Sequence, residues 1–367
     1  MSPQKKSTFF KRIAHYGPRR TFNKLQQRIL QRFHGYPRSI LLQAVSACNL
    51  KCEHCFLNNF GKEIGDGVIR ILPYDDFIAR ADKIKHLIRH VHSFYFSGFE
   101  ALLHKDLFRM MDYIVSINPA IEFPIMTNGN SFTPRIFDEL TKHPIPEISV
   151  SLDGISRETV ESFKTGAVFE KTVETIKTLV SLDLNASIGT VFVLHKGNRH
   201  EFIDYLDFVN DLGVKDVYVT NLMSFTPALR DRYLYTPDSN PELDTLFSRT
   251  IEKAKKNRQS LTLPATHAML KGCTQWNLLF IDIVGNVAPC DYLSVSTPFE
   301  LFGETQQTRP LIFGNIMNDD ILSIWNGKAF KKFRAMHRSG KKLPGHCRLC
   351  ADAWGLVCSN RTVYDFR

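Results

Sequence analysis

Short apolar runs alternate with longer amphipathic stretches between residue 38 and about residue 225. Runs of this kind, bounded by turn residues, are typical of buried strands. They lie at residues 39–45, 93–96, 123–126, 148–152, 188–194 and 217–220. The stretches between them carry apolar residues at spacings of three and four, which predicts helices at 74–90, 107–117, 133–142, 169–182 and 201–212. Alternation of this kind predicts a parallel sheet covered by helices.

The number of β–α units narrows the choice of α/β fold. Six units are too few for a closed barrel of eight strands. We therefore expect an open, partial (β/α)6 TIM-like barrel. A flat, doubly wound sheet is the alternative.

The pattern changes in the last third of the chain. Residues 231–241 are rich in Asp, Pro, Ser and Asn, which is typical of a linker. Further on, the pattern predicts strands at 278–283 and 287–289, a hairpin turn between them at 285–286, and a helix at 321–336. The expected organisation is a basic arm (1–37), the barrel (38–235), a linker helix (236–264) and a small α+β domain with a hairpin (265–367).

The excess of positive charge is confined to the N-terminal arm. The chain has 47 Lys and Arg against 37 Asp and Glu, and residues 1–40 hold ten of the basic residues and no acidic one. Subtracting those ten from 47 leaves 37 basic residues against 37 acidic residues, so the rest of the chain is balanced. Nucleic-acid binding by the folded body is therefore not expected.

The arm also has an amphipathic pattern, with Phe22, Leu25, Ile29 and Phe33 on one helical face. Packing of this stripe on the barrel is the simpler interpretation; docking of an electron donor, a membrane surface or a carrier-bound substrate is the alternative. The chain has no run of 18 apolar residues, and no apolar stretch of 7–15 residues follows the first basic residues. Neither a transmembrane helix nor a secretory signal is expected, and the expected location is the cytoplasm.

The eight cysteines fall into two groups that lie more than two hundred residues apart. Without a secretory signal, such groups indicate metal or cluster ligands rather than disulfides. The first group, Cys48, Cys52 and Cys55, directly follows the first predicted strand. Three thiolates can hold three irons of a 4Fe–4S cluster and leave the fourth iron open. Zinc with His54 as fourth ligand is the alternative, but this ring is wedged between Glu53 and Cys55, which makes a shared tetrahedral geometry difficult.

With this spacing and an aromatic residue, His54, before the last cysteine, residues 38–225 resemble the radical S-adenosylmethionine (SAM) superfamily. The resemblance implies that the amino and carboxylate groups of SAM bind the open iron. It also implies that an electron from the cluster cleaves SAM into methionine and a 5′-deoxyadenosyl radical, which abstracts a hydrogen atom from the substrate. We therefore expect an enzyme of oxidoreductase or epimerase type.

The loop after the second predicted strand is similar to the Gly-Gly-Glu-Pro loop of this family, which binds the SAM amino group. Gly98, Phe99 and Glu100 occupy it, with Phe99 in place of a glycine and Ala101 in place of the proline. Gly98 keeps a permissive backbone and Glu100 keeps an acceptor for an ammonium group. We expect this loop to bind SAM.

Two further loops follow the third and fourth predicted strands. Thr127 and Asn128 lie in the first of them, and Ser151 and Asp153 lie in the second. Both loops resemble those that line the ribose and methionine parts of SAM in this family. The resemblance implies that these four residues bind SAM.

The second cysteine group resembles the cluster-binding C-terminal extension called SPASM, or its shortened form, the twitch domain. The group comprises Cys273, Cys290, Cys347, Cys350 and Cys358. Five cysteines cannot ligate two 4Fe–4S clusters, so one auxiliary 4Fe–4S cluster is expected. The twitch pattern would use the first four and leave Cys358 spare; alternatively, Cys358 replaces one of the Cys347–Cys350 pair. A zinc site on the same thiolates is the competing interpretation.

Two residues of this region are candidates for catalysis. Asp291 directly follows Cys290, and sulfatase-maturing enzymes of the family have a proton-accepting aspartate after the matching cysteine. Asp291 is therefore a candidate base, and a solvated turn carboxylate is the plainer interpretation. The spare Cys358 is a candidate hydrogen-atom donor, with a structural ligand as its competing role. For Tyr292, packing is the simpler interpretation.

The expected reaction is dehydrogenation or epimerisation of a carbohydrate-like or other small polar substrate. The short segment before the barrel, about 37 residues, favours this substrate class over a peptide. A maturase of a ribosomally made peptide is the alternative, and a non-catalytic iron–sulfur electron carrier is the alternative of another class. The expected protein partner is an electron donor of the flavodoxin or ferredoxin type.

Overall fold

The computed structural model describes residues 35–56, 71–97, 99–182, 184–357 and 361–367. The helical stripe expected at 21–33 lies outside the described residues, and so do Gly98 and Cys358. In the part of the chain that is described, no helix is long and apolar enough to cross a membrane.

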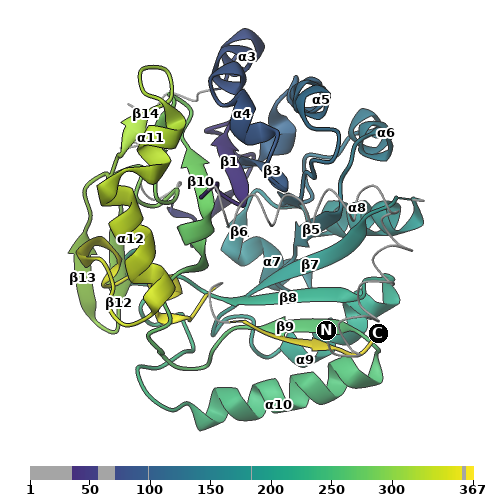
Figure 1. The fold of residues 1–367 in the computed structure, drawn as a ribbon. Coiled ribbons are helices and arrows are strands. Elements are labelled where there is room, and N and C mark those ends of the chain that lie inside the picture. Colours follow the sequence, from purple (N-terminus) through teal and green to yellow (C-terminus); the bar gives the residue numbers. More distant parts are fainter. Residues whose placement is uncertain (1–34, 57–70, 98, 183, 358–360) are drawn as a thin grey trace, which may run out of the picture.

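The core of the fold is built from parallel strands that follow one another in chain order and belong to two hydrogen-bonded sheets, which an isolated bridge connects (Figure 1). Its strands are β1 (Ser39–Gln43), β3 (Ser93–Ser97), β4 (Ile125–Thr127), β5 (Glu147–Ser151), β7 (Ser187–Leu194) and β8 (Asp216–Asn221). β1 pairs with β3, a bridge between Ser93 and Glu122 continues toward β4, and β4, β5, β7 and β8 pair in that order. A doubly wound sheet requires a point at which the strand order reverses, and this strand order has no such point. The expected partial barrel is therefore confirmed.

Helices cover the outside of these strands, and all but the short helix at 157–163, which was not predicted, lie at nearly the predicted positions. They are α3 (Tyr74–Lys83), α4 (Lys85–Ile88), α5 (Leu107–Ile117), α6 (Pro134–Lys142), α7 (Arg157–Phe163), α8 (Phe169–Ser181) and α9 (Phe202–Asp211). The single helix expected at 74–90 is wrong, because the chain breaks at Ile84. The Ile84 N–H donates to Ala81 three residues back, which tightens the turn and ends α3.

The region expected to be a linker also contributes to the sheet. α10 (Pro241–Lys256) is followed by β9 (Ser260–Leu263), which pairs in parallel with β8. The C-terminal strand β15 (Thr362–Asp365) pairs antiparallel with β9. The sheet therefore continues past the predicted six units.

The other edge of the sheet is extended by the C-terminal domain. β10 (Leu278–Ile281) pairs in parallel with β1, and β11 (Asn286–Ala288) returns antiparallel beside it. The predicted hairpin is confirmed, but its turn runs from Asp282 to Gly285 and Asn286 already belongs to the strand. Asp282 Oδ1 accepts the N–H of Asn286, and Gly285 has φ +92°, which the turn requires.

The rest of the C-terminal domain flanks this hairpin along the chain. It contains η3 (Thr274–Asn277), β12 (Pro298–Leu301), β13 (Glu304–Gln307), β14 (Gly314–Asn315), α11 (Ile321–Asn326) and α12 (Lys328–Ser339). The single helix expected at 321–336 is wrong, because Gly327 separates α11 from α12. Buried Leu279, Ile281 and Trp325 belong to the same hydrophobic core as Ile40 of β1. The barrel and the hairpin therefore share one core.

Candidate functional site

The first cysteine loop leaves the carboxyl end of β1 and is held by a short antiparallel pair. β2 (Lys51–Cys52) pairs with β6 (Lys164–Thr165), and the Glu53 N–H donates to the carbonyl of Phe163. All three thiols of the loop are half-buried. The Cys48 Sγ accepts the N–H of Leu50 at 3.3 Å. The loop thus presents three thiols at the carboxyl end of the strands, where enzymes with a β/α barrel have their active sites.

His54 within this loop packs as an aromatic side chain. Its ring stacks on Phe163 with centroids 4.9 Å apart, and Phe163 stacks on His195 at 4.0 Å. Burial lowers the pKa of His54 to about 4, so the ring is neutral at pH 7. The zinc interpretation, which needs this ring as a ligand, gains no support from the stack.

The loops after β3 and β4 meet beside Cys48. The Glu100 side chain is almost fully buried at 1% exposure. Its Oε1 accepts from Thr127 Oγ1 and its Oε2 accepts from the Asn128 N–H, each at 2.9 Å. Burial raises the pKa of Glu100, whereas these hydrogen bonds lower it. The Asn128 amide nitrogen lies 3.6 Å from the Cys48 Sγ. The structure therefore brings Glu100, Thr127 and Asn128 together at the first thiol.

Phe99 takes a backbone conformation that favours glycine, with φ +20°. Its position is the one where the resembling loop has a glycine. The loop therefore keeps the glycine-like backbone although the side chain is large, which costs about 1–2 kcal/mol.

The loop after β5 is tied to β6 by a buried ion pair. Lys164 Nζ lies 2.9 Å from Asp153 Oδ2, with side-chain exposures of only 4% and 1%. Lys164 also donates to Ser151 Oγ at 2.8 Å, and Asp153 Oδ1 accepts the Val193 N–H at 2.8 Å. Ser151 and Asp153 are thus bound by protein groups. Lys164 lies opposite Cys52 in the β2–β6 pair, so a buried cation stands beside the first cysteine loop.

Lys164 was missed by sequence reasoning. A lysine just after an amphipathic stretch looks like an ordinary surface residue. No nearby motif indicates that the aspartate eleven positions earlier is its partner. Its partner Asp153 lies in the turn between β5 and α7. In that turn a Cβ on Gly154 would lie 2.6 Å from Glu201 Oε2 and 2.8 Å from Thr159 Cγ2, so a larger residue would have to displace both side chains.

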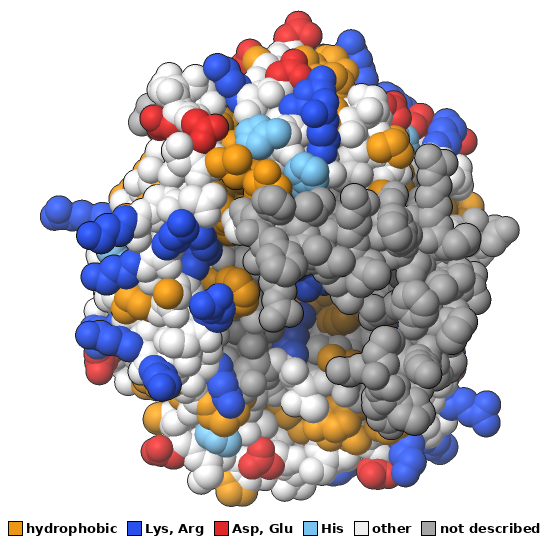
Figure 2. All heavy atoms as spheres, in the orientation of Figure 1, with side chains coloured by type: hydrophobic (Ala, Val, Ile, Leu, Met, Phe, Trp, Pro, Cys, Tyr) orange, Lys and Arg blue, Asp and Glu red, His pale blue; other side chains and the backbone are white. Residues whose placement is uncertain are grey.

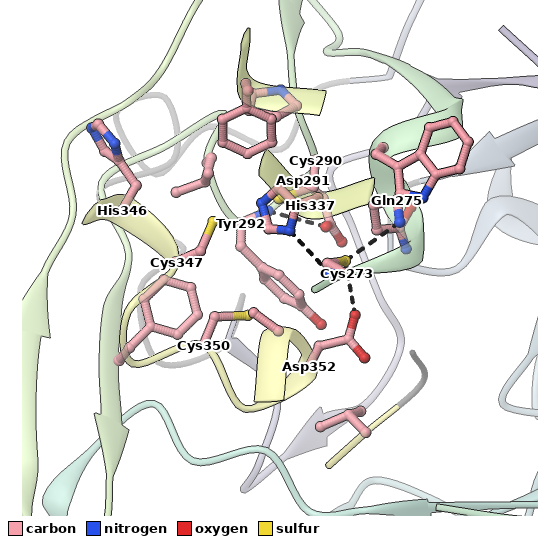
Figure 3. A pocket seen from close by; sticks show the side chains of 17 residues that line it. Cys273, Gln275, Cys290, Asp291, Tyr292, His337, His346, Cys347, Cys350 and Asp352 are labelled. Atoms are coloured by element: carbon pink, nitrogen blue, oxygen red, sulfur yellow. Dashed lines mark hydrogen bonds between the residues drawn. The ribbon is translucent and has the colours of Figure 1, made fainter. Parts of the chain in front are cut away.

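Four cysteines of the second group line one cavity (Figure 3). They are Cys273, Cys290, Cys347 and Cys350, and they surround a space of about 100 Å³. Burial raises the pKa of all four thiols, and their neighbouring acidic groups raise it further. Among the described residues, no three His, Cys, Asp or Glu side chains meet at the spacing of a single bound metal ion.

This donor set fits an iron–sulfur cluster. Clusters are held by four cysteine thiolates, and four thiols face one space here. Thiols that resist ionisation when buried together become thiolates when a bound cation compensates their charge. The four cysteines would therefore hold the cluster as its ligands.

Two side chains that sequence reasoning missed contact Cys273. Asp352 Oδ2 accepts from the Cys273 Sγ at 3.0 Å, and His337 Nδ1 accepts from the Cys273 N–H at 3.0 Å (Figure 3). Burial lowers the pKa of His337 to about 4, so its ring is neutral and carries its proton on Nε2. No motif marks either residue, because His337 lies 64 positions and Asp352 79 positions from Cys273.

Asp291 lies on the wall of the same cavity, next to Cys290. Its Oδ1 accepts the N–H of Tyr292 at 3.0 Å. Burial raises the pKa of Asp291 to about 6. A half-buried carboxyl at the cavity wall can accept a proton from a neighbouring donor. Cys358, the other catalytic candidate, lies beyond the described residues.

Aromatic rings connect the two cysteine sites. Phe56 directly follows Cys55, and Tyr292 lies two positions after Cys290. Their rings meet edge to face with centroids 5.0 Å apart, and Phe225 contacts both. We call Phe56, Phe225, Tyr292 and Phe299 the aromatic bridge; Phe299 completes it against Phe225 and Tyr292.

Known families match both parts of the chain. The radical SAM superfamily matches residues 43–209, and SPASM, an iron–sulfur cluster-binding domain, matches residues 273–351. Together with the partial barrel and the two cysteine sites, these matches show that the chain belongs to the radical SAM superfamily and carries a SPASM domain. It is a radical SAM enzyme whose cofactors are SAM, a SAM-binding 4Fe–4S cluster and auxiliary iron–sulfur in the SPASM domain.

Curated relatives cover most of the chain. The AdoMet-dependent heme synthase of Methanosarcina barkeri is 27% identical over 344 residues, which is 86% of this chain and 88% of that protein. The tungsten-containing aldehyde ferredoxin oxidoreductase cofactor-modifying protein of Pyrococcus furiosus is 25% identical, over 80% of this chain and 82% of its own. The PqqA peptide cyclase of Bradyrhizobium diazoefficiens is 24% identical, and the match covers 84% of this chain and 78% of that protein.

Solved structures share the fold. SuiB from Streptococcus suis has a TM-score of 0.62 at 17% identity, over 92% of this chain and 76% of its own. The protein anSMEcpe with bound AdoMet has a TM-score of 0.59 at 16% identity, and the match covers 86% of this chain and 88% of that protein. At this identity the likeness concerns the fold alone.

Proposed function

We propose that the protein is a radical SAM oxidoreductase that dehydrogenates its substrate. The observation that carries this proposal is the position of Asp291, a carboxyl on the wall of the cavity that the four cysteines line. Dehydrogenation removes two hydrogens. The radical takes the first as a hydrogen atom, and the second leaves as one proton and one electron, which require an acceptor each. Asp291 and the auxiliary cysteine site would put both acceptors in one place.

The chain's own residues would divide the work as follows. SAM and its cluster, when bound, supply the radical that takes the hydrogen atom, and the auxiliary cluster supplies a one-electron acceptor. The Glu100 carboxylate would accept a hydrogen bond from the ammonium group of SAM beside Cys48, because Thr127 and Asn128 hold this carboxylate in place. Asp291 would take the proton that leaves the substrate.

The proposed substrate is a small polar molecule, carbohydrate-like or of cofactor type. Two of the three relatives above carry names that refer to a heme or another cofactor, and they cover 86% and 80% of this chain. Peptide modification is the second candidate, because the PqqA peptide cyclase covers 84% of this chain. Epimerisation would instead need a hydrogen donor, for which Cys358 is the candidate.

The test of the reaction type uses Asp291→Asn in anaerobically reconstituted protein. We expect 5′-deoxyadenosine to form still, while product falls by about 10²–10⁴-fold, the usual contribution of a general base. Asp291→Glu, which keeps a carboxyl, should retain part of the activity. Product formed normally by the Asn variant would contradict the role of Asp291. Product that carries deuterium from deuterated water at a retained C–H centre would indicate epimerisation.

The substrate class can be tested without knowing the substrate. Turnover is followed as 5′-deoxyadenosine released from SAM after addition of a low-molecular-mass extract or a peptide extract from the source cells. We expect the small-molecule extract to stimulate release. Stimulation by the peptide extract alone would favour the peptide-modifying candidate.

A further inference from the structure

α12 presents a dense group of positive charges to solvent. No acidic residue occurs between Lys328 and Arg348. Six exposed cations of this segment form what we call the basic face: Lys328, Lys331, Lys332, Arg338, Lys341 and Lys342. Figure 2 shows Lys and Arg side chains gathered on the side of the molecule where Figure 1 places α12. The charge balance of the folded body therefore hides a local excess.

The basic face is not neutralised by any residue that the structure describes. None of its six side chains has an ion-pair partner among the residues that the structure describes. The neighbouring Arg348, by contrast, pairs with Glu304 at 2.5 Å. Like charges at spacings of three and four on a helix repel one another. An unneutralised face of this kind attracts an acidic partner.

The opposite face of the same helix forms part of the auxiliary cysteine cavity. Phe333 and His337 line that cavity, and His337 accepts the N–H of Cys273. The two backbones also touch, because a Cβ on Gly272 would lie 2.2 Å from the His337 carbonyl. α12 therefore separates the cavity from solvent by the thickness of one helix, about 10–12 Å with side chains.

We propose that the basic face of α12 is the docking surface of an acidic one-electron carrier protein that exchanges electrons with the auxiliary cluster. In the reaction that can be measured, the reduced carrier loses one electron and the auxiliary cluster gains it. No bond forms or breaks and no proton moves. A carrier seated on α12 has its redox centre close to the cavity, because only this helix lies between them.

The position of the basic face favours this partner over other polyanions. Nucleic acid or an anionic membrane would be attracted by the same charges. Neither would gain from a binding surface whose reverse side is the wall of the cluster cavity. An electron carrier is the partner for which both the charge and the short path matter.

The test compares two matched double variants of the full-length holoprotein. Lys331→Glu with Lys332→Glu reverses two adjacent lysines of α12. Lys255→Glu with Lys256→Glu reverses two adjacent exposed lysines at the C-terminal end of α10, a helix that contacts α9 and β9 of the barrel. The probe is flavodoxin, an acidic flavin protein. Calorimetric titration gives its affinity, and stopped-flow absorbance gives the rate at which its hydroquinone is oxidised. Replacing Cys48, Cys52 and Cys55 by Ala in every sample leaves only the auxiliary cluster to accept electrons.

We expect the α12 variant to lose about tenfold in affinity and in electron-transfer rate at low ionic strength, and the loss to shrink at high ionic strength. The α10 variant should stay within about twofold of the parent protein, since its charges are not at the interface. Iron content and circular dichroism confirm that both variants are folded. Equal losses in both variants, or no loss in either, would overturn the proposal. So would unchanged flavodoxin binding in an α12 variant that no longer binds duplex DNA or phosphatidylserine vesicles.

Discussion

The ring of Phe56 meets the ring of Tyr292 edge to face, with centroids 5.0 Å apart. Phe56 follows the last cysteine of the SAM-cluster loop, and Tyr292 lies two positions after Cys290 of the auxiliary site. The contact therefore ties the two cysteine sites together through side chains. An edge-to-face pair contributes about 0.5–1.5 kcal/mol beyond its buried area.

This contact leads to the first prediction. Phe56→Leu and Tyr292→Leu should each destabilise the protein, and the double variant should lose less than the sum by about 0.5–1.5 kcal/mol. Urea unfolding of the four proteins, followed by circular dichroism, measures the coupling. Tyr292→Phe serves as the control because it keeps the ring. Strict additivity would mean that the two rings touch without stabilising each other.

The second prediction concerns iron. Two 4Fe–4S clusters imply about eight irons per chain after anaerobic reconstitution. Replacing Cys48, Cys52 and Cys55 together by Ala should leave about four, and replacing Cys273 and Cys290 should also leave about four. Iron analysis and electron paramagnetic resonance measure both. Stoichiometric zinc in protein purified without oxygen is the result that would contradict this ligand assignment.

The third prediction concerns the affinity for SAM. Glu100→Ala removes the acceptor for the SAM ammonium, and one charge-assisted hydrogen bond contributes about 1.5–3 kcal/mol. Affinity should fall by about ten- to a hundredfold or slightly more, as equilibrium dialysis with SAM can show. Glu100→Gln is the matched comparison, because it keeps the size of the side chain and an acceptor oxygen and removes only the charge. Equal affinity of the Ala variant and the parent, with iron unchanged, would remove Glu100 from the SAM site.

The fourth prediction concerns the buried ion pair of Lys164 and Asp153. Lys164→Met leaves Asp153 as an unpaired buried charge, which should destabilise the protein by about 3–5 kcal/mol. The double variant Lys164→Met, Asp153→Leu should recover a large part of that loss, because no charge remains buried. Urea unfolding compares the three proteins. A double variant no more stable than the single one would show that the pair is not coupled in this way.

Local periodicity was sufficient to predict the barrel strands. Each of the six predicted strands lies within about two residues of its counterpart at most ends, since period-two and short apolar patterns depend on near neighbours only. The helix breaks at Ile84 and Gly327 were missed, because the apolar spacing continues across both positions. Boundaries set by a local turn are weakly encoded in such spacing.

Contacts between distant parts of the chain could not be predicted. The spacing of the cysteines was sufficient to select them as candidate cluster ligands. Lys164, His337 and Asp352, by contrast, acquire their positions from elements that lie far from their partners in sequence. The same holds for β10, whose place beside β1 joins segments more than two hundred residues apart. Pairing at such separations leaves no trace in the local pattern.

The place of β10 beside β1 also limits how the molecule can move. Four residue pairs, from Ser39 with Leu278 to Leu42 with Ile281, run along this junction, and the side chains of both strands lie in one core. A hinge between barrel and auxiliary domain would have to break this ladder and expose two sheet edges at once. The distance between the two cysteine sites is therefore as rigid as a sheet interior, and any opening for a substrate has to come from surface loops.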